Sequence, residues 1–99
     1  MTETNHNFTR NGIQVDASLW TGVHGGRFEV WVNDLSICCW EGDRPAADHN
    51  SASIEMHAMS EIVDFLAYAK EEEAEGSDTV PPAETITACR RATGCEVTP

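Results

Sequence analysis

Residues 27–40 read RFEVWVNDLSICCW, two short apolar–polar alternations on either side of Asn33 and Asp34. Alternation with a period of two is typical of a β-strand with one buried face. Asn and Asp tolerate the positive φ angles that a two-residue hairpin turn needs. The stretch therefore predicts an antiparallel hairpin of strands 27–32 and 35–40, and a fold built on an antiparallel sheet.

The same alternation divides the side chains of the hairpin between two faces. Phe28, Val30 and Ile37 fall on the predicted core face, whereas Trp31 and Trp40 fall together on the opposite face. Exposed Trp residues are common in binding hot spots. The face with both Trp is therefore a candidate contact surface, unless the faces are reversed and the Trp residues form the core.

Sequence on both sides of the hairpin extends the predicted sheet. Further strands are predicted at 13–19, 54–58 and 85–91. Residues 1–12 are polar, so we expect a flexible N-terminal segment followed by one domain over 13–99.

One helix is predicted over 61–75, with Ser60 as its N-cap and Gly76 as its end; residues 53–60 are the alternative start. Its apolar stripe consists of Ile62, Val63, Phe65, Leu66 and Ala69. The predicted fold class is α+β: an antiparallel sheet of four to five strands with one amphipathic acidic helix packed on one face.

The polar side of this helix is strongly acidic. Its acidic stripe consists of Glu61, Asp64, Glu71, Glu72 and Glu75, with Tyr68 among them. Acidic side chains near a helix C-terminus oppose the helix dipole, which a helix shaped only for stability would avoid. The stripe is either a solvated face that aids solubility or an array of carboxylates, imitating phosphates, that binds a basic groove.

The charge of the whole chain limits its partners. Seventeen acidic residues against six Lys and Arg give a net charge of −11. Such a surface repels nucleic-acid backbones and anionic membranes and attracts basic proteins. No apolar run approaches the roughly 18 residues of a membrane span, and the N-terminus has no signal-peptide core. We therefore expect a cytoplasmic protein that binds neither nucleic acid nor membrane.

The sequence contains no recognised catalytic or phosphate-binding motif, so we expect no enzymatic activity and no cofactor. Cys38 and Cys39 are adjacent in a predicted strand and point to opposite faces, so they cannot readily bridge. Cys89 and Cys95 could lie opposite each other across a hairpin. A mixed zinc site of these two residues with His49 and His57 is a weaker alternative to the absence of metal, because no tight Cys pair is present.

The segment RFEVWVNDLSICCWEGD, followed by SEIVDFLAYAKEEEAE, resembles in size, charge and layout the small acidic inhibitors of phages and mobile elements. These include anti-CRISPR and anti-restriction proteins. The resemblance implies a DNA mimic that blocks a basic nucleic-acid-handling protein, such as a CRISPR effector. It extends equally to immunity proteins and antitoxins against nucleases. The alternative is a small adaptor or accessory domain that uses the Trp face, in which two copies could also pair as a homodimer.

Overall fold

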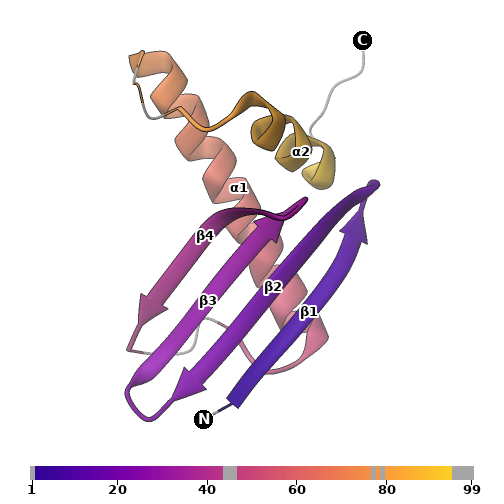
Figure 1. Ribbon diagram of the computed structural model, residues 1–99, viewed down its shortest axis with the longest axis vertical. Helices are drawn as coiled ribbons and strands as arrows, with labels where there is room; N and C mark the ends of the chain where they lie inside the picture. The colour runs from indigo at the N-terminus through magenta and orange to yellow at the C-terminus, as the bar shows by residue number, and fades with distance from the viewer. Residues whose placement is uncertain (1, 44–46, 77, 79, 95–99) are drawn as a thin grey trace.

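The computed structural model describes residues 2–43, 47–76, 78 and 80–94 (Figure 1). Its elements are β1 (Thr2–Arg10), β2 (Ile13–Gly22), β3 (Gly25–Val32), β4 (Leu35–Gly42), α1 (Ser51–Glu75) and α2 (Ala83–Thr93). The strands form one antiparallel sheet in the order β1-β2-β3-β4. The predicted α+β class is confirmed, with two helices in place of one.

The predicted hairpin over 27–40 is confirmed as β3 and β4. Asn33 and Asp34 form its turn with φ angles of 48° and 67°. The pairing shifts within the hairpin, because Val30 lies opposite Cys38 while Trp31 lies opposite Ser36. One extra residue on β4 therefore forms a β-bulge, and side chains beyond it change face relative to a strict alternation.

The N-terminal segment is a strand, so the prediction of a flexible 1–12 is wrong for the residues described. β1 pairs with β2 along its whole length. The turn between them is Asn11-Gly12, with φ angles of 52° and 82°, and Asn-Gly is a strong hairpin signal. The alternation in β1 was missed because its inward-facing positions include polar Thr4 and His6 beside Phe8.

α1 begins far earlier than predicted. Its N-cap is Asn50, whose side chain accepts a hydrogen bond of 2.8 Å from the backbone N–H of Ser53. The strand predicted over 54–58 is therefore helix, because Ile54 and Ala58 are fully buried with the four-residue spacing of a helix face. Gly76 ends α1 with a φ of 67°, as predicted.

The strand predicted over 85–91 is also helix. β-branched residues suggested a strand there, but the buried Thr85, Ile86 and Cys89 of α2 follow helical spacing. Gly94 ends the helix with a φ of 77°. The side-chain amide of Asn11 donates to two carbonyl oxygens of the last turn, at 3.0 and 3.2 Å. This contact fastens α2 to the β1–β2 turn.

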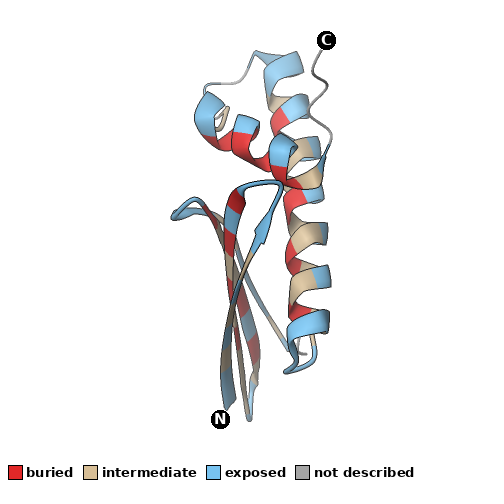
Figure 2. Ribbon diagram, turned by 90° about the vertical axis from the view of Figure 1, so that its right-hand side faces the viewer, coloured by how far each residue is buried: buried red, intermediate tan, exposed pale blue. Residues whose placement is uncertain are grey.

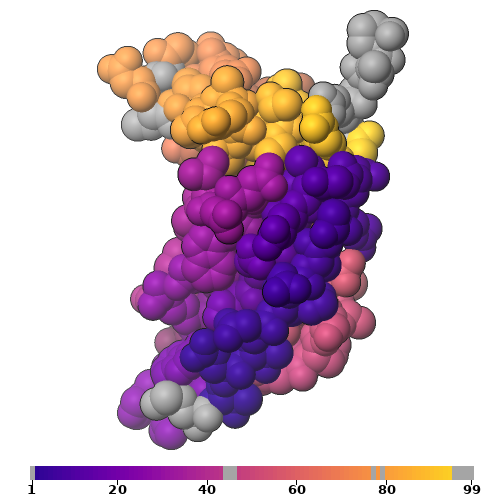
Figure 3. Space-filling view, turned by 45° about the vertical axis from the view of Figure 1, so that its right-hand side comes forward, coloured from indigo at the N-terminus to yellow at the C-terminus, as the bar shows by residue number. Residues whose placement is uncertain are grey.

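The core lies between one face of the sheet and the two helices. Its largest fully buried side chains are Phe28, Leu19, Ile54, Ile62, Val15, Val30, Val32 and Cys89. Figure 2 shows α1 along one side of the sheet, and α2 beyond the strand ends. In Figure 3 the orange and yellow atoms of the helices stand beyond the strands. Within the described residues, no helix is long and apolar enough to cross a membrane.

Candidate functional site

α1 makes different side-chain contacts toward the two edges of the sheet. Toward β1, Glu55 accepts a hydrogen bond from Arg10 Nη2 at 2.9 Å. Toward β4, the thiol of Cys38 donates to Glu61 Oε2 at 3.1 Å. Because residues three, four and seven apart share one side of a helix, the side of Glu61 that faces β4 also carries Asp64 and Tyr68.

The six contact residues predicted on α1 divide into two groups. Glu61 is half-buried, lies 3.6 Å from His57 Nε2 and accepts the Cys38 thiol. Glu72 is also partly buried. The other four side chains are exposed, and we call them the acidic flank: Asp64, Tyr68, Glu71 and Glu75. Glu61 therefore anchors the helix to β4 rather than facing solvent with the others.

Cys38 shows the electrostatic effect of this junction. Burial, together with the hydrogen bond and negative charge of Glu61, raises the pKa of the thiol to about 12. Cys39 and Asp64 contribute smaller electrostatic effects in the same direction. The thiol therefore stays protonated at neutral pH and acts as a hydrogen-bond donor, not as a nucleophile.

The two Trp residues predicted to share a face lie on opposite faces of the sheet. Trp31 lies opposite Asp16 of β2, on the face without helices. Trp40 lies opposite Phe28, on the helix side. The bulge in β4 is the physical reason, since an extra residue reverses the side to which later side chains point. A single contact face bearing both Trp therefore does not exist.

Trp40 instead lies at the margin of the sheet on the side of α1. Its ring covers Gly42 so closely that an added Cβ there would clash with the ring. The side chain remains 38% exposed, and Leu35 at the other end of β4 is 41% exposed. β4 thus carries two exposed apolar side chains along its edge.

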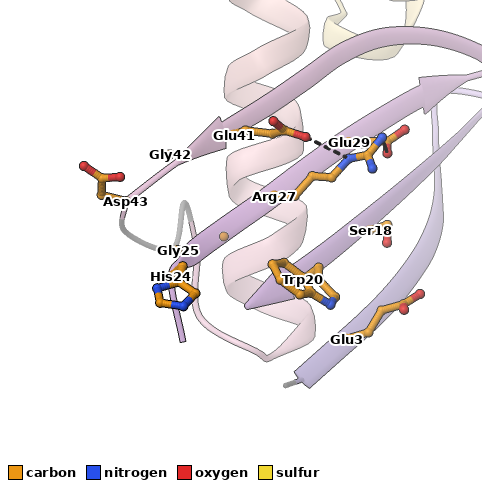
Figure 4. Close-up of a pocket in the computed structure, with 11 residues that line it drawn as sticks. Glu3, Ser18, Trp20, His24, Gly25, Arg27, Glu29, Glu41, Gly42 and Asp43 are labelled. Atoms are coloured by element: carbon orange, nitrogen blue, oxygen red, sulfur yellow. Dashed lines mark ion pairs between the residues drawn. The ribbon is translucent and has the colours of Figure 1, made fainter. Parts of the chain in front are cut away.

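The face of the sheet without helices carries an open hollow of about 720 Å³ near the β2–β3 turn (Figure 4). It is lined by Glu3, Ser18, Trp20, His24, Gly25, Gly26, Arg27, Glu29, Glu41, Gly42 and Asp43. Sequence reasoning missed this site. The available signal was the cluster of glycines near the β2–β3 turn. Because glycines have no side chains, they leave space beside Trp20 of β2 and Arg27 of β3.

Arg27 of β3 lines the hollow beside Glu29 and Glu41. It forms an ion pair with Glu29, and its Nε lies 3.8 Å from Glu41 Oε1. The side chain of Cys39, then Glu29 and Glu41, raise the pKa of Arg27. Figure 4 places Ser18 and His24 on opposite sides of Trp20, so these two side chains do not form a nucleophile–base pair. Ion pairs within the hollow therefore offset the charge of Arg27.

The residues of the predicted zinc set are not brought together. His49 contacts Thr4 Oγ1 at 2.7 Å and Thr21 Oγ1 at 2.8 Å, near the β2–β3 turn. Cys89 is buried in α2 at the opposite end of the sheet, where burial raises its thiol pKa to about 11. Cys95 lies outside the described residues, and so does the question of its pairing with Cys89. Across the described part of the chain, no three His, Cys, Asp or Glu side chains form a metal-binding group.

Two surfaces thus stand out, the acidic flank beside β4 and the hollow on the open face of the sheet. The first contains the predicted Asp64, Tyr68, Glu71 and Glu75. Comparisons with protein-family models, with curated proteins and with solved structures find no match.

Proposed function

We propose that the protein is an acidic inhibitor that binds and blocks a basic nucleic-acid-handling protein, of which a CRISPR effector is one example. The observation that carries this proposal is the acidic flank. Its carboxylates are exposed, and the C-terminal part of α1, which includes Glu71 and Glu75, reaches beyond the strands (Figure 3). A partner groove can therefore approach this end of the flank without meeting the sheet, whereas Asp64 lies beside β4.

The placement of these charges supports a binding role. The last turn of α1 contains no basic residue, although a cation there would interact favourably with the helix dipole. Each acidic side chain at this end costs about 0.3–1 kcal/mol at low salt. From Asp64 to Glu75 the flank covers about 16 Å along the helix. An unfavourable arrangement of this length is explained if the carboxylates bind cationic groups of a partner.

The net charge of −11 supports a protein partner rather than nucleic acid. It also favours rapid association with a basic surface, because long-range attraction raises the encounter rate. The same reasoning suits an immunity protein or antitoxin that neutralises a nuclease. An adaptor that uses one face with both Trp31 and Trp40 is less well supported, since these residues lie on opposite faces.

A capture experiment with a matched control tests the proposal. The bait is the wild-type protein or the triple variant Asp64→Lys, Glu71→Lys and Glu75→Lys. The control reverses three exposed carboxylates elsewhere: Glu3→Lys, Asp48→Lys and Glu84→Lys. Each triple variant changes the net charge equally, so the comparison separates the location of charge from its total amount.

Each bait is incubated with nuclease-treated bacterial lysate and washed at stepped salt, and bound proteins are identified by mass spectrometry. We expect wild type and the control to retain a basic nucleic-acid-handling protein that the flank variant loses. Its retention should fall steeply with ionic strength. Equal capture by the flank variant at low salt would show that the acidic flank serves solubility only.

A further inference from the structure

β4 is one of the two edge strands of the sheet, and its outer edge has no neighbouring strand among the described residues. An edge strand presents backbone N–H and C=O groups that can pair with an extended segment of another chain. The other edge is β1, which carries charged Glu3 and Arg10 and exposes no large apolar side chain. β4 has one charged residue, Glu41, and exposes Leu35 and Trp40.

Carboxylates lie on both sides of this edge. Glu41 lies near the end of β4, and Asp43 is the first residue after the strand. Both residues line the hollow on the open face of the sheet (Figure 4). On the helix side, Asp64 is close enough to Cys38 of β4 for its charge to raise the thiol pKa. Side chains of an added strand would point alternately to these two sides, so both sets would meet negative charge.

The regular part of β4 beyond the bulge is long enough for such pairing. Cys38–Gly42 continues in register with β3, from Val30↔Cys38 to Gly26↔Gly42. Five residues of extended chain cover about 17 Å. Trp40 lies in the middle of this segment with its ring partly exposed on the helix side, where the side chains of an added strand would cover it.

From these observations we infer that β4 accepts a basic extended segment of the partner as a fifth strand of the sheet. The segment pairs with Cys38–Gly42 and directs Lys or Arg side chains toward Glu41 and Asp43 on one face and toward Asp64 on the other. This inference rests on the proposed function and specifies its binding mode: backbone pairing at β4 gives the register, and carboxylates on both faces select a basic sequence.

Synthetic peptides test the strand addition directly. The probe is Lys-Lys-Val-Thr-Lys-Lys-Val, which places Lys on both faces of the added strand, and the first control replaces every Lys with Glu. The second control keeps the Lys residues but carries N-methyl groups on all interior backbone amides, so it has the same charge and cannot donate ladder hydrogen bonds. Hydrogen exchange of the backbone amides of β4 is measured by NMR, with the amides of β1 as the internal reference.

Of the three peptides, we expect only the unmodified Lys peptide to slow hydrogen exchange of the β4 amides. At nine-tenths occupancy the slowing is about tenfold for amides that exchange only from the free form. Amides of β1 should be unchanged. Glu41→Gln combined with Asp64→Asn should weaken the effect, whereas Asp48→Asn combined with Glu84→Gln, at exposed carboxylates away from β4 and the acidic flank, should leave it largely intact.

A second readout uses the exposed Cys39 of β4 in a Cys95→Ser background, where Cys38 and Cys89 have raised pKa values. The Lys peptide should slow alkylation of Cys39. Equal binding of the N-methylated peptide, or protection of β1 in place of β4, would overturn strand addition. Those results would leave the acidic-inhibitor proposal standing if flank reversal still abolished capture, so the two ideas fail separately.

Discussion

At the scale of single residues, the Cys38–Glu61 contact joins β4 to α1. The pKa of the Cys38 thiol is raised to about 12, first by burial and next by Glu61. Glu61→Gln keeps an acceptor oxygen but removes the charge, so we expect the thiol pKa to fall toward the value set by burial. The measurement is thiolate absorbance against pH in a Cys39→Ser, Cys95→Ser background.

Asp64→Asn is the matched control for that change. Asp64 is the last of the groups that raise the Cys38 pKa, so its neutralisation should lower that pKa by less than Glu61→Gln does. An equal effect of the two variants would mean that general negative charge, rather than the hydrogen bond of 3.1 Å, holds the thiol protonated.

At the scale of elements, the start of α1 depends on one cap. Asn50 accepts from the Ser53 amide, and replacing such a cap by Ala costs about 0.5–2 kcal/mol. We therefore expect Asn50→Ala to lower the free energy of unfolding by this amount in urea titrations. Ser60→Ala, at the cap that the sequence suggested, should change stability little or raise it, because residue 60 is exposed in mid-helix.

The contact of α1 with β1 should depend on pH. The hydrogen bond from Arg10 is the main cause that lowers the Glu55 pKa below 4.5, and His6, 3.5 Å away, acts in the same direction. A lowered carboxyl pKa stabilises the fold above the unfolded value and loses this effect as pH falls through the folded value. Wild type should therefore exceed Glu55→Gln in urea midpoint at pH 7, and the difference should close below about pH 4.

The same elements show what the sequence could and could not predict. The β3–β4 hairpin followed from clear alternation and turn residues, and α1 ended at Gly76 as expected. α2 was misassigned because Thr-Ile-Thr has strand propensity, whereas burial of Cys89 and the contact with Asn11 depend on tertiary packing. The faces of Trp31 and Trp40 were misassigned because a one-residue bulge leaves no sequence signal of its own.

Helical spacing alone could predict that Asp64, Tyr68, Glu71 and Glu75 are exposed on one helix; their role in contact stays a prediction. The burial of Glu61 could not be predicted, because it depends on the approach of Cys38 from β4. The hollow around Trp20 and Arg27 could not be predicted either, because its shape depends on the register of all four strands.

At the scale of the whole molecule, self-repulsion follows from a charge of −11 on a body of 45 × 28 × 17 Å. Glu71→Lys with Glu75→Lys reduces repulsion and suits the dipole of α1. We expect stabilisation of about 0.3–1 kcal/mol per site at low salt, which high salt should screen. Thermal unfolding at low and high ionic strength measures it.

Glu84→Lys is the matched control, because Glu84 lies in the first turn of α2 where a negative charge is favourable. This substitution makes the same change in net charge as each flank substitution, yet its local dipole effect is destabilising. If Glu84→Lys stabilised the protein by a similar amount, the stabilisation by Glu71→Lys and Glu75→Lys would come from net charge alone.

The meander order of the strands has a kinetic consequence. Each strand pairs with its neighbour in the chain, so the ladder can close through short loops and without crossovers, which favours rapid folding. Both helices follow the sheet in sequence, however, and α1 covers its apolar face while α2 packs beyond the strand ends. During synthesis the four strands leave the ribosome first, and their apolar face stays open to association with other nascent chains until α1 has emerged and docked.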